Sequence, residues 1–174
     1  MNKTNEINNN NVLSSEEILK EDINFIEEPV NKFKEPVIKT LQVKQNKENF
    51  GKTIIPFGAH PEEHEKEIAK ILNKYGKDVE FLIPVETKYA KTPDVKMDGQ
   101  LWEIKSPEGN SNRTIENNLR CALKQSTNII IDLRRIKVDE TKAISQIKKQ
   151  FVFSKSIRKI VIIKKNSKVL DILR

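Results

Sequence analysis

Residues 93–105, PDVKMDGQLWEIK, constrain the fold most, because they encode a strand, a two-residue turn and a second strand. Asp98-Gly99 is a dipeptide favoured in hairpin turns whose two central residues both need a positive φ. With this turn, residues whose numbers add up to 197 face each other across the hairpin, so Asp94 is opposite Glu103. The sequence therefore predicts an antiparallel hairpin with a defined register.

Asp94, Glu103 and Lys105 are expected on one face of this hairpin, because alternate residues of a strand point to the same side. Trp102 and Ile104 then point to the other face and anchor the strand in the core. Directly opposed carboxylates repel each other. Mg²⁺ or Mn²⁺ would remove the repulsion, because these ions prefer oxygen ligands.

A surface hairpin with a Lys–Glu ion pair and no catalytic role is the alternative interpretation, and the spacing alone fits both. The apolar residues Leu101, Trp102 and Ile104 beneath the acids favour the metal site. Pro93, directly before Asp94, favours it as well.

The rest of the chain predicts an α/β fold with a mixed central sheet of about four or five strands flanked by helices. Apolar residues at helical spacing predict the helices, and the continuous apolar run at 128–133 suits a strand that is buried on both faces. The predicted helices are 61–75, 114–125 and 140–151, and the predicted strands lie near 79–83, 93–97, 100–105, 128–133, 159–165 and 168–173.

The Asn-rich start of the chain predicts a disordered leader over residues 1–50, because it offers too little apolar surface to offset chain entropy. One domain, residues 51–174, follows. A single Cys excludes a disulfide framework and indicates a reducing compartment. The apolar runs are far too short to span a bilayer, and the N-terminus lacks the apolar core of a Sec signal peptide. We expect no membrane partner, and the sequence does not indicate an oligomeric state.

Basic charge is concentrated at the end of the chain. Residues 134–174 hold 13 Lys or Arg against three acids, a balance of +10. Such a segment favours a polyanionic partner, because basic side chains that neutralise phosphates release counterions. Arg134, Arg135 and Lys137 directly follow a predicted central strand, where ligand sites of α/β folds usually lie. A solvated face of a Lys-rich protein is the alternative.

Pro93-Asp94 followed by Glu103-Ile104-Lys105 resembles the signature of the PD-(D/E)xK nuclease superfamily. The longer string KTPDVKMDGQLWEIKSPEGNS, with the helix and the NIIIDLRR strand after it, is similar to the C-terminal nuclease domain of contact-dependent growth-inhibition toxins of the tRNA nuclease type. This resemblance covers about residues 55–174.

The resemblance implies a restriction-endonuclease-like core and metal-dependent cleavage of nucleic acid, with tRNA favoured over DNA. It also implies a possible immunity protein as partner. The protein is then expected to act in the cytoplasm, or in a target cell that it reaches by a route the sequence does not show.

The resemblance also implies roles for single residues. Asp94 and Glu103, with the backbone carbonyl of Ile104, would hold the Mg²⁺ or Mn²⁺ ion. Lys105 would orient the attacking water and neutralise charge in the transition state. Glu65, on the helix before the core sheet, would complete the ligand set. The alternative for Glu65 is a first-turn acid that stabilises the helix dipole.

Weaker candidates lie near this site. Gln125 and Ser106 are candidate contacts for the substrate phosphate. His60 and His64 are four residues apart, but we expect capping or solvent exposure rather than zinc binding. Cys121 is expected to be a small buried residue of the core.

Three other functions remain open from the sequence: a DNase of the same superfamily, a metal-independent ribonuclease toxin of the barnase or RelE-like class, and a non-catalytic nucleic-acid-binding module of a mobile element. Aromatic residues make up only 6% of the chain, which leaves little to stack on unpaired bases. This shortage favours a structured RNA, bound through its phosphates and 2′-hydroxyls, over a general single-stranded substrate.

Overall fold

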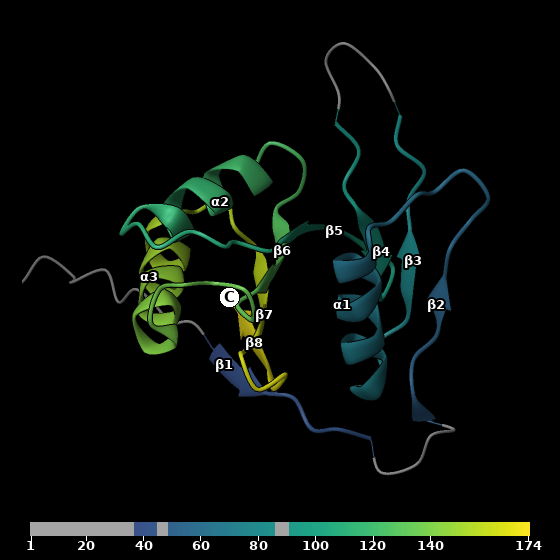
Figure 1. Ribbon diagram of the computed structural model, residues 1–174, viewed down its shortest axis with the longest axis horizontal. Helices are drawn as coiled ribbons and strands as arrows, with labels where there is room; N and C mark the ends of the chain where they lie inside the picture. Colours follow the sequence, from purple (N-terminus) through teal and green to yellow (C-terminus); the bar gives the residue numbers. More distant parts are fainter. Residues whose placement is uncertain (1–36, 45–48, 86–90) are drawn as a thin grey trace, which may run out of the picture. The chain divides into compact units, whose positions relative to one another are not determined.

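The computed structural model describes residues 37–44, 49–85 and 91–174, which all fall in one compact unit, Lys34–Arg174. In these residues three helices accompany an eight-stranded mixed sheet (Figure 1). The predicted α/β class with a mixed central sheet is confirmed. The predicted disorder of the leader concerns residues that mostly lie outside the described part.

The sheet has the order β1-β8-β7-β6-β5-β4-β3-β2. Strands β3, β4 and β5 form an antiparallel meander, β5, β6 and β7 run parallel, and β8 returns antiparallel to β7. The strands are β1 (Val37–Thr40), β2 (Thr53–Ile54), β3 (Val79–Phe81), β4 (Val95–Met97), β5 (Gln100–Lys105), β6 (Asn128–Asp132), β7 (Lys159–Ile163) and β8 (Val169–Leu173). The helices are α1 (Glu63–Lys74), α2 (Thr114–Ala122) and α3 (Glu140–Phe153). No described helix is long and apolar enough to cross a membrane.

The hairpin of β4 and β5 has the predicted register. Val95 pairs with Trp102, and Met97 pairs with Gln100. Asp98 and Gly99 have φ values of 50° and 75°, as the predicted two-residue turn requires. The indole N–H of Trp102 donates to the carbonyl of Met97 at 3.1 Å, which ties the apolar face of the hairpin together.

Alternate residues of the central strands pack into two separate cores, one on each face of the sheet. Ile130 and Ile104 belong to the core under α1, whereas Ile129 and Ile131 belong to the core under α2 and α3. Strand β6 is buried on both faces for this reason, as its apolar run predicts. Helices α2 and α3 lie together in Figure 1, apart from α1.

Helices α2 and α3 do not cover the whole of their face of the sheet. On β4 and β5, Lys96 is exposed and Leu101 is 49% exposed on the face opposite α1. By the same alternation, Glu103 and Lys105 belong to this face. The partly open face therefore gives solvent a route toward the predicted site.

Two edge strands were not predicted, and the sheet has eight strands rather than four or five. Strand β1 is exposed at all four positions, and β2 has only two residues, so neither leaves a burial pattern in the sequence. Strand β1 pairs with β8 although it lies in the segment assigned to the leader. The boundary near Gly51 stays a prediction, and the structure adds that residues before it contribute to the sheet.

Removing residues 1–50 is expected to leave a cooperatively folding protein that melts at a lower temperature than a protein starting at Lys34. The shorter protein loses the β1–β8 pairing and the hydrogen bond from Leu41 N to Val169 O, 3.0 Å. A net loss of about 1–2 kcal/mol corresponds to a melting temperature roughly 3–8 °C lower. Thermal melting of both proteins checks this, and equal melting temperatures would show that β1 does not contribute to stability.

Candidate functional site

Asp94 lies directly before β4 and is fixed against β5. Its Oδ2 accepts a hydrogen bond from the backbone N–H of Ile104 at 2.6 Å, and its carbonyl accepts one from Leu82 N at 3.0 Å. The first bond joins Asp94 to β5, the strand that carries Glu103, and the second joins it to the segment after β3. The structure thus brings together the two carboxylates that the hairpin register predicts to be neighbours.

Glu103 is a buried carboxylate in the middle of the sheet, with 1% of its surface exposed. Its Oε1 accepts hydrogen bonds from Lys105 Nζ and from Gln125 Nε2. Its Oε2 is buried and has no hydrogen-bond partner among the described residues. Burial raises the pKa of Glu103 to about 7, with a smaller contribution from the negative charge of Asp94. Lys105 acts in the opposite direction but does not outweigh the burial.

These features fit a divalent cation. A buried carboxylate is costly unless a charge or hydrogen bonds compensate it, and here one oxygen is left without either. Mg²⁺ is commonly held by one or two carboxylates, with water and substrate phosphate at its other positions. Asp94 and Glu103 offer that minimal set, and the Ile104 carbonyl is the predicted third ligand. Within residues 37–44, 49–85 and 91–174, no group of three His, Cys, Asp or Glu side chains forms a metal cluster.

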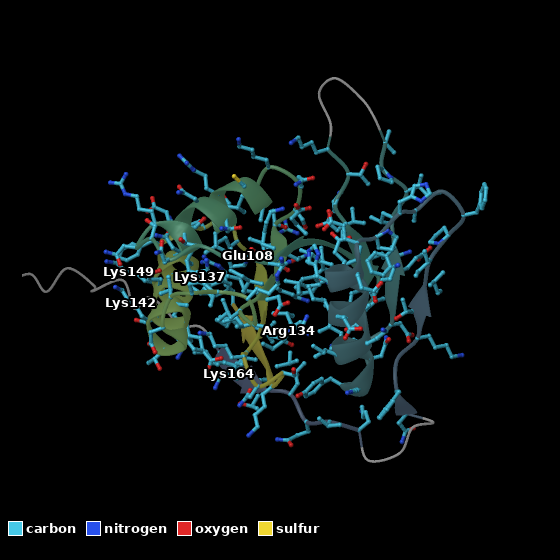
Figure 2. The ribbon with its side chains drawn as sticks, in the orientation of Figure 1. Glu108, Arg134, Lys137, Lys142, Lys149 and Lys164 are labelled. Carbon is cyan, nitrogen blue, oxygen red and sulfur yellow. The ribbon has the colours of Figure 1, made fainter. Side chains whose placement is uncertain are left out.

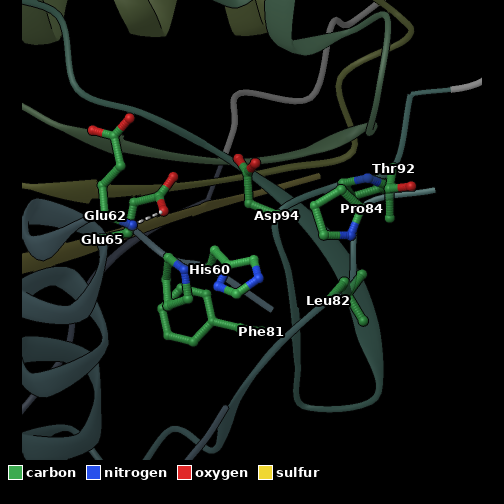
Figure 3. Close-up of a pocket in the computed structure, with 10 residues that line it drawn as sticks. His60, Glu62, Glu65, Phe81, Leu82, Pro84, Thr92 and Asp94 are labelled. Atoms are coloured by element: carbon green, nitrogen blue, oxygen red, sulfur yellow. Dashed lines mark hydrogen bonds between the residues drawn. The ribbon is translucent and has the colours of Figure 1, made fainter. Parts of the chain in front are cut away.

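Glu65 lies in the first turn of α1, where its carboxylate has a structural role at the helix start. Its Oε2 accepts a hydrogen bond from the backbone N–H of Glu62 at 2.8 Å and so helps to cap α1. Glu65 also lies near the candidate site. Burial raises the pKa of its carboxyl group, and the negative charge of the nearby Asp94 raises this pKa further. Glu65 and Asp94 line one pocket (Figure 3). A role of Glu65 as a metal ligand remains a prediction.

Gln125 contacts the Glu103 carboxylate, and Ser106 lies three residues after Glu103 in the chain. The two residues differ in their hydrogen bonds. Gln125, predicted to contact phosphate, donates to Glu103 in this structure and so positions this side chain. Ser106 directly follows Lys105, and its buried Oγ has no hydrogen-bond partner among the described residues. For both residues, a contact with the substrate phosphate remains a prediction.

The basic residues after β6 are not equally available to a substrate. Arg134 forms a bidentate pair with the buried Asp132, with Nη2 to Oδ2 at 2.8 Å and Nε to Oδ1 at 2.9 Å. Arg135 pairs with Glu108. Lys137 is exposed, and no ion pair holds it within the described part of the chain. Lys137 therefore differs from its two predicted partners.

Lys137 lies two residues before Asp139, the N-cap of α3, and Lys142 and Lys149 lie on that helix (Figure 2). Lys142 donates to the Asn112 side chain at 2.7 Å, which ties the loop before α2 to α3. Lys164 pairs with Glu140 at 3.3 Å.

The structure also shows the surroundings of both histidines and of the cysteine. His60 is exposed, and His64 Nδ1 lies 3.1 Å from Glu62 Oε2. Cys121 is exposed, so its predicted place in the core was wrong. The buried face of α2 is formed by Ile115, Leu119 and Ala122, and Cys121 precedes the last of these on the outer side.

The sequence did not predict the role of Asp132 or the place of His60 in a pocket with Asp94. Asp132 is fully buried at the end of β6 and fixes Arg134, a pairing that the apolar run NIIID followed by an arginine could have suggested. His60 lines the same pocket as Asp94. The sequence contains no signal for this second contact, because the two residues are 34 positions apart.

Comparisons with known proteins bear on the family and the fold of this chain. Residues 91–169 match the family model of the contact-dependent growth inhibition CdiA C-terminal domain. The fold is similar to a chain in the CdiA-CT/CdiI toxin and immunity complex from Burkholderia pseudomallei, with 19% identity and a TM-score of 0.56. That match covers 71% of this chain and 100% of the other. No curated protein matches.

The site and the fold thus define an α/β domain with a carboxylate pair on a central hairpin. The family resemblance inferred from the sequence is confirmed: residues 91–169 match the CdiA C-terminal domain model, and the fold is similar to that of the CdiA-CT/CdiI complex chain.

The metal-free protein is expected to lose stability as the pH rises from 4.5 toward 7. The folded protein keeps the Glu103 proton up to a pKa of about 7, whereas an unfolded chain releases it near the ordinary value of 4.5. Unfolding between these values releases a proton, so rising pH favours the unfolded state. Chemical unfolding in EDTA at several pH values measures the slope. Glu103→Gln should flatten it and Glu116→Gln, an exposed control, should not; equal slopes in wild type and Glu103→Gln would contradict the assignment.

Arg134→Ala and Lys137→Ala are expected to have different effects. Arg134→Ala leaves Asp132 buried without its ion pair and should lower the free energy of unfolding by about 3 kcal/mol or more. Lys137→Ala should leave stability unchanged and, if this surface binds the polyanion that the sequence predicts, should reduce the salt dependence of that binding by roughly one phosphate contact. Denaturant unfolding and binding titrations at several salt concentrations check both. An unchanged salt slope in Lys137→Ala would remove this residue from the binding surface.

Proposed function

We propose that this domain is a metal-dependent nuclease whose divalent ion is held by Asp94 and Glu103. The observation that carries the proposal is the buried Oε2 of Glu103, which lacks a hydrogen-bond partner in the described structure and lies on a carboxylate adjacent to Asp94. The order α1, β3–β4–β5, α2, β6 places the acids on the central hairpin, as in the superfamily that the sequence resembles.

Mg²⁺ or Mn²⁺ would act at this site as a Lewis acid and would lower the pKa of a bound water. The chain's own residues prepare the site for this. Asp94 is fixed by its hydrogen bond from Ile104, and Glu103 is fixed by Lys105 and Gln125. The Lys105 side chain is 22% exposed, so its ammonium group reaches both the buried carboxylate and the solvent. This position suits a group that orients water and neutralises charge on the phosphate.

Structured RNA, and tRNA in particular, is the substrate that we propose. The support is the resemblance to tRNA-cleaving toxin domains, together with the +10 charge of residues 134–174 and the low aromatic content. Lys137, Lys142 and Lys149 lie around α3 and would contact phosphates (Figure 2). A DNase of the same superfamily would use the same carboxylates, and the experiment below separates the two.

An immunity protein is the proposed protein partner, since the similar fold from Burkholderia pseudomallei was solved as a toxin and immunity complex. Because the basic segment gives this chain a net charge of +7, we expect an acidic partner surface. We propose that the toxin acts inside a target cell, in keeping with the contact-dependent growth inhibition of its family.

Asp94→Asn, Glu103→Gln and Lys105→Ala are each expected to reduce cleavage by at least about a hundredfold, because each removes several kcal/mol of transition-state stabilisation. The purified protein is incubated with Mg²⁺, Mn²⁺ or EDTA and, in parallel, with total tRNA, rRNA and plasmid DNA. Discrete tRNA fragments that depend on the metal and leave the DNA intact are the expected result.

Glu116→Gln is the matched control for these variants, because it changes an exposed carboxylate on α2. Melting temperatures show whether a variant is folded. Full activity of Asp94→Asn or Glu103→Gln contradicts the site, cleavage in EDTA indicates a metal-independent ribonuclease, and nicked plasmid with intact tRNA identifies a DNase.

A further inference from the structure

A pocket of about 220 Å³ lies between the start of α1 and the segments that flank β3 and β4 (Figure 3). Its wall includes Asp94, so it adjoins the candidate metal site directly. Apart from Glu65, whose role as a metal ligand remains a prediction, the proposed cleavage chemistry does not use the other residues of the pocket.

One side of the pocket is apolar and partly flat. Phe81 also lines the pocket, but it is 2% exposed and packed in the core, so the accessible apolar surface there belongs to the half-buried Leu82. Three proline rings, Pro61, Pro84 and Pro93, complete this side. Rigid flat side chains of this kind suit the face of a planar ring, because they lose little conformational entropy on binding.

The polar side of the pocket consists mainly of hydrogen-bond acceptors. Glu62, Glu65 and Asp94 contribute three carboxylates, and the imidazole of His60 also lines the pocket. Thr92 Oγ1 accepts a hydrogen bond from Val85 N at 2.8 Å, which leaves the hydroxyl proton for a ligand. The Glu62 side chain is 75% exposed and remains accessible at the rim, although its Oε2 is also 3.1 Å from His64 Nδ1. The polar side therefore repels phosphate and attracts N–H groups.

Size and charge together restrict the occupant. The pocket is smaller than the roughly 300–1,000 Å³ of sites that enclose drug-sized ligands. It has room for a single planar ring system rather than a whole nucleotide. The occupant should present an apolar face to Leu82 and the prolines, and should direct hydrogen-bond donors at the carboxylates.

We propose that this pocket holds one unstacked nucleobase of the substrate that carries an exocyclic amine, with the amino edge directed at Glu62. The inference rests on the proposed nuclease function, because a base held beside Asp94 leaves the adjoining phosphate next to the metal site. Single-stranded bases in RNA are commonly bound by stacking and by hydrogen bonds to their Watson–Crick edge. Guanine, adenine and cytosine carry the amine. Uracil does not, and its carbonyl oxygens face the carboxylates unfavourably.

Nucleoside binding tests the pocket without any cleavage. Guanosine, adenosine, cytidine and uridine are titrated into isotope-labelled wild-type protein in EDTA, and the amide resonances of residues lining the pocket are followed by NMR. The amine-bearing nucleosides should shift these resonances, and uridine should shift them at least several-fold less. Equal shifts with all four, or no shifts, would overturn the proposal. Shifts with arginine amide alone would assign the pocket to a side chain of a protein partner.

Glu62→Gln is the informative variant, and Glu63→Gln is its matched control. Both remove one negative charge from the start of α1, but Glu63 does not line the pocket. Glu62→Gln also keeps the backbone N–H that bonds Glu65. Only Glu62→Gln should weaken binding of the amine-bearing nucleosides, by roughly tenfold for one lost charge-assisted hydrogen bond.

Cleavage mapping separates this proposal from the proposed function. With tRNA and Mg²⁺ or Mn²⁺, Glu62→Gln should still cleave but with an altered base preference next to the cut, whereas Glu63→Gln should cut as wild type does. Cleavage with an unchanged preference in Glu62→Gln would overturn the base pocket and leave the nuclease intact. Nucleoside binding by a wild-type protein that cleaves nothing would support the pocket and contradict the nuclease.

Discussion

The burial of Glu103 beside Asp94 is the constraint on which this domain depends. A carboxylate that is 1% exposed, with one oxygen left unpartnered, is unfavourable unless something compensates it. Lys105 and Gln125 compensate one oxygen. Trp102, on the opposite face of the same strand, is packed into the core and keeps this strand in place. The fold thus holds the acids together although they repel, and a divalent cation would relieve that repulsion.

Asp94 and Glu103 have different neighbours on the two faces of the sheet. Helices α2 and α3 cover one core, and α2 is followed directly by Gln125, which reaches Glu103. Helix α1 covers the other core and brings Glu65 and a base-sized pocket next to Asp94. In the proposed function the pair therefore has a phosphate site, a neighbouring base site and a basic surface around α3.

Much of this was predictable from the sequence where local chemistry determines structure. The Asp98-Gly99 turn determined the register, and that register placed Asp94 beside Glu103. Strands β1 and β2 were not predictable, because an exposed edge strand and a two-residue strand leave no hydrophobic pattern. The hydrogen bond of Gln125 and the pairing of Arg134 with Asp132 also escaped prediction, since both depend on tertiary packing. A pattern in one sequence shows which residues share a face, but not which partners they meet there.

The most direct test of the account is the number of protons released when Mn²⁺ binds. Isothermal titration calorimetry near pH 6, repeated in buffers with different ionisation enthalpies, measures this number. Because the pKa of Glu103 is raised to about 7 in the metal-free protein, most molecules carry its proton at that pH and must release it to bind the ion. The account predicts a release approaching one proton per Mn²⁺, which is lost in Glu103→Gln. Mn²⁺ binding without proton release, or equal binding by wild type and Glu103→Gln, would contradict it.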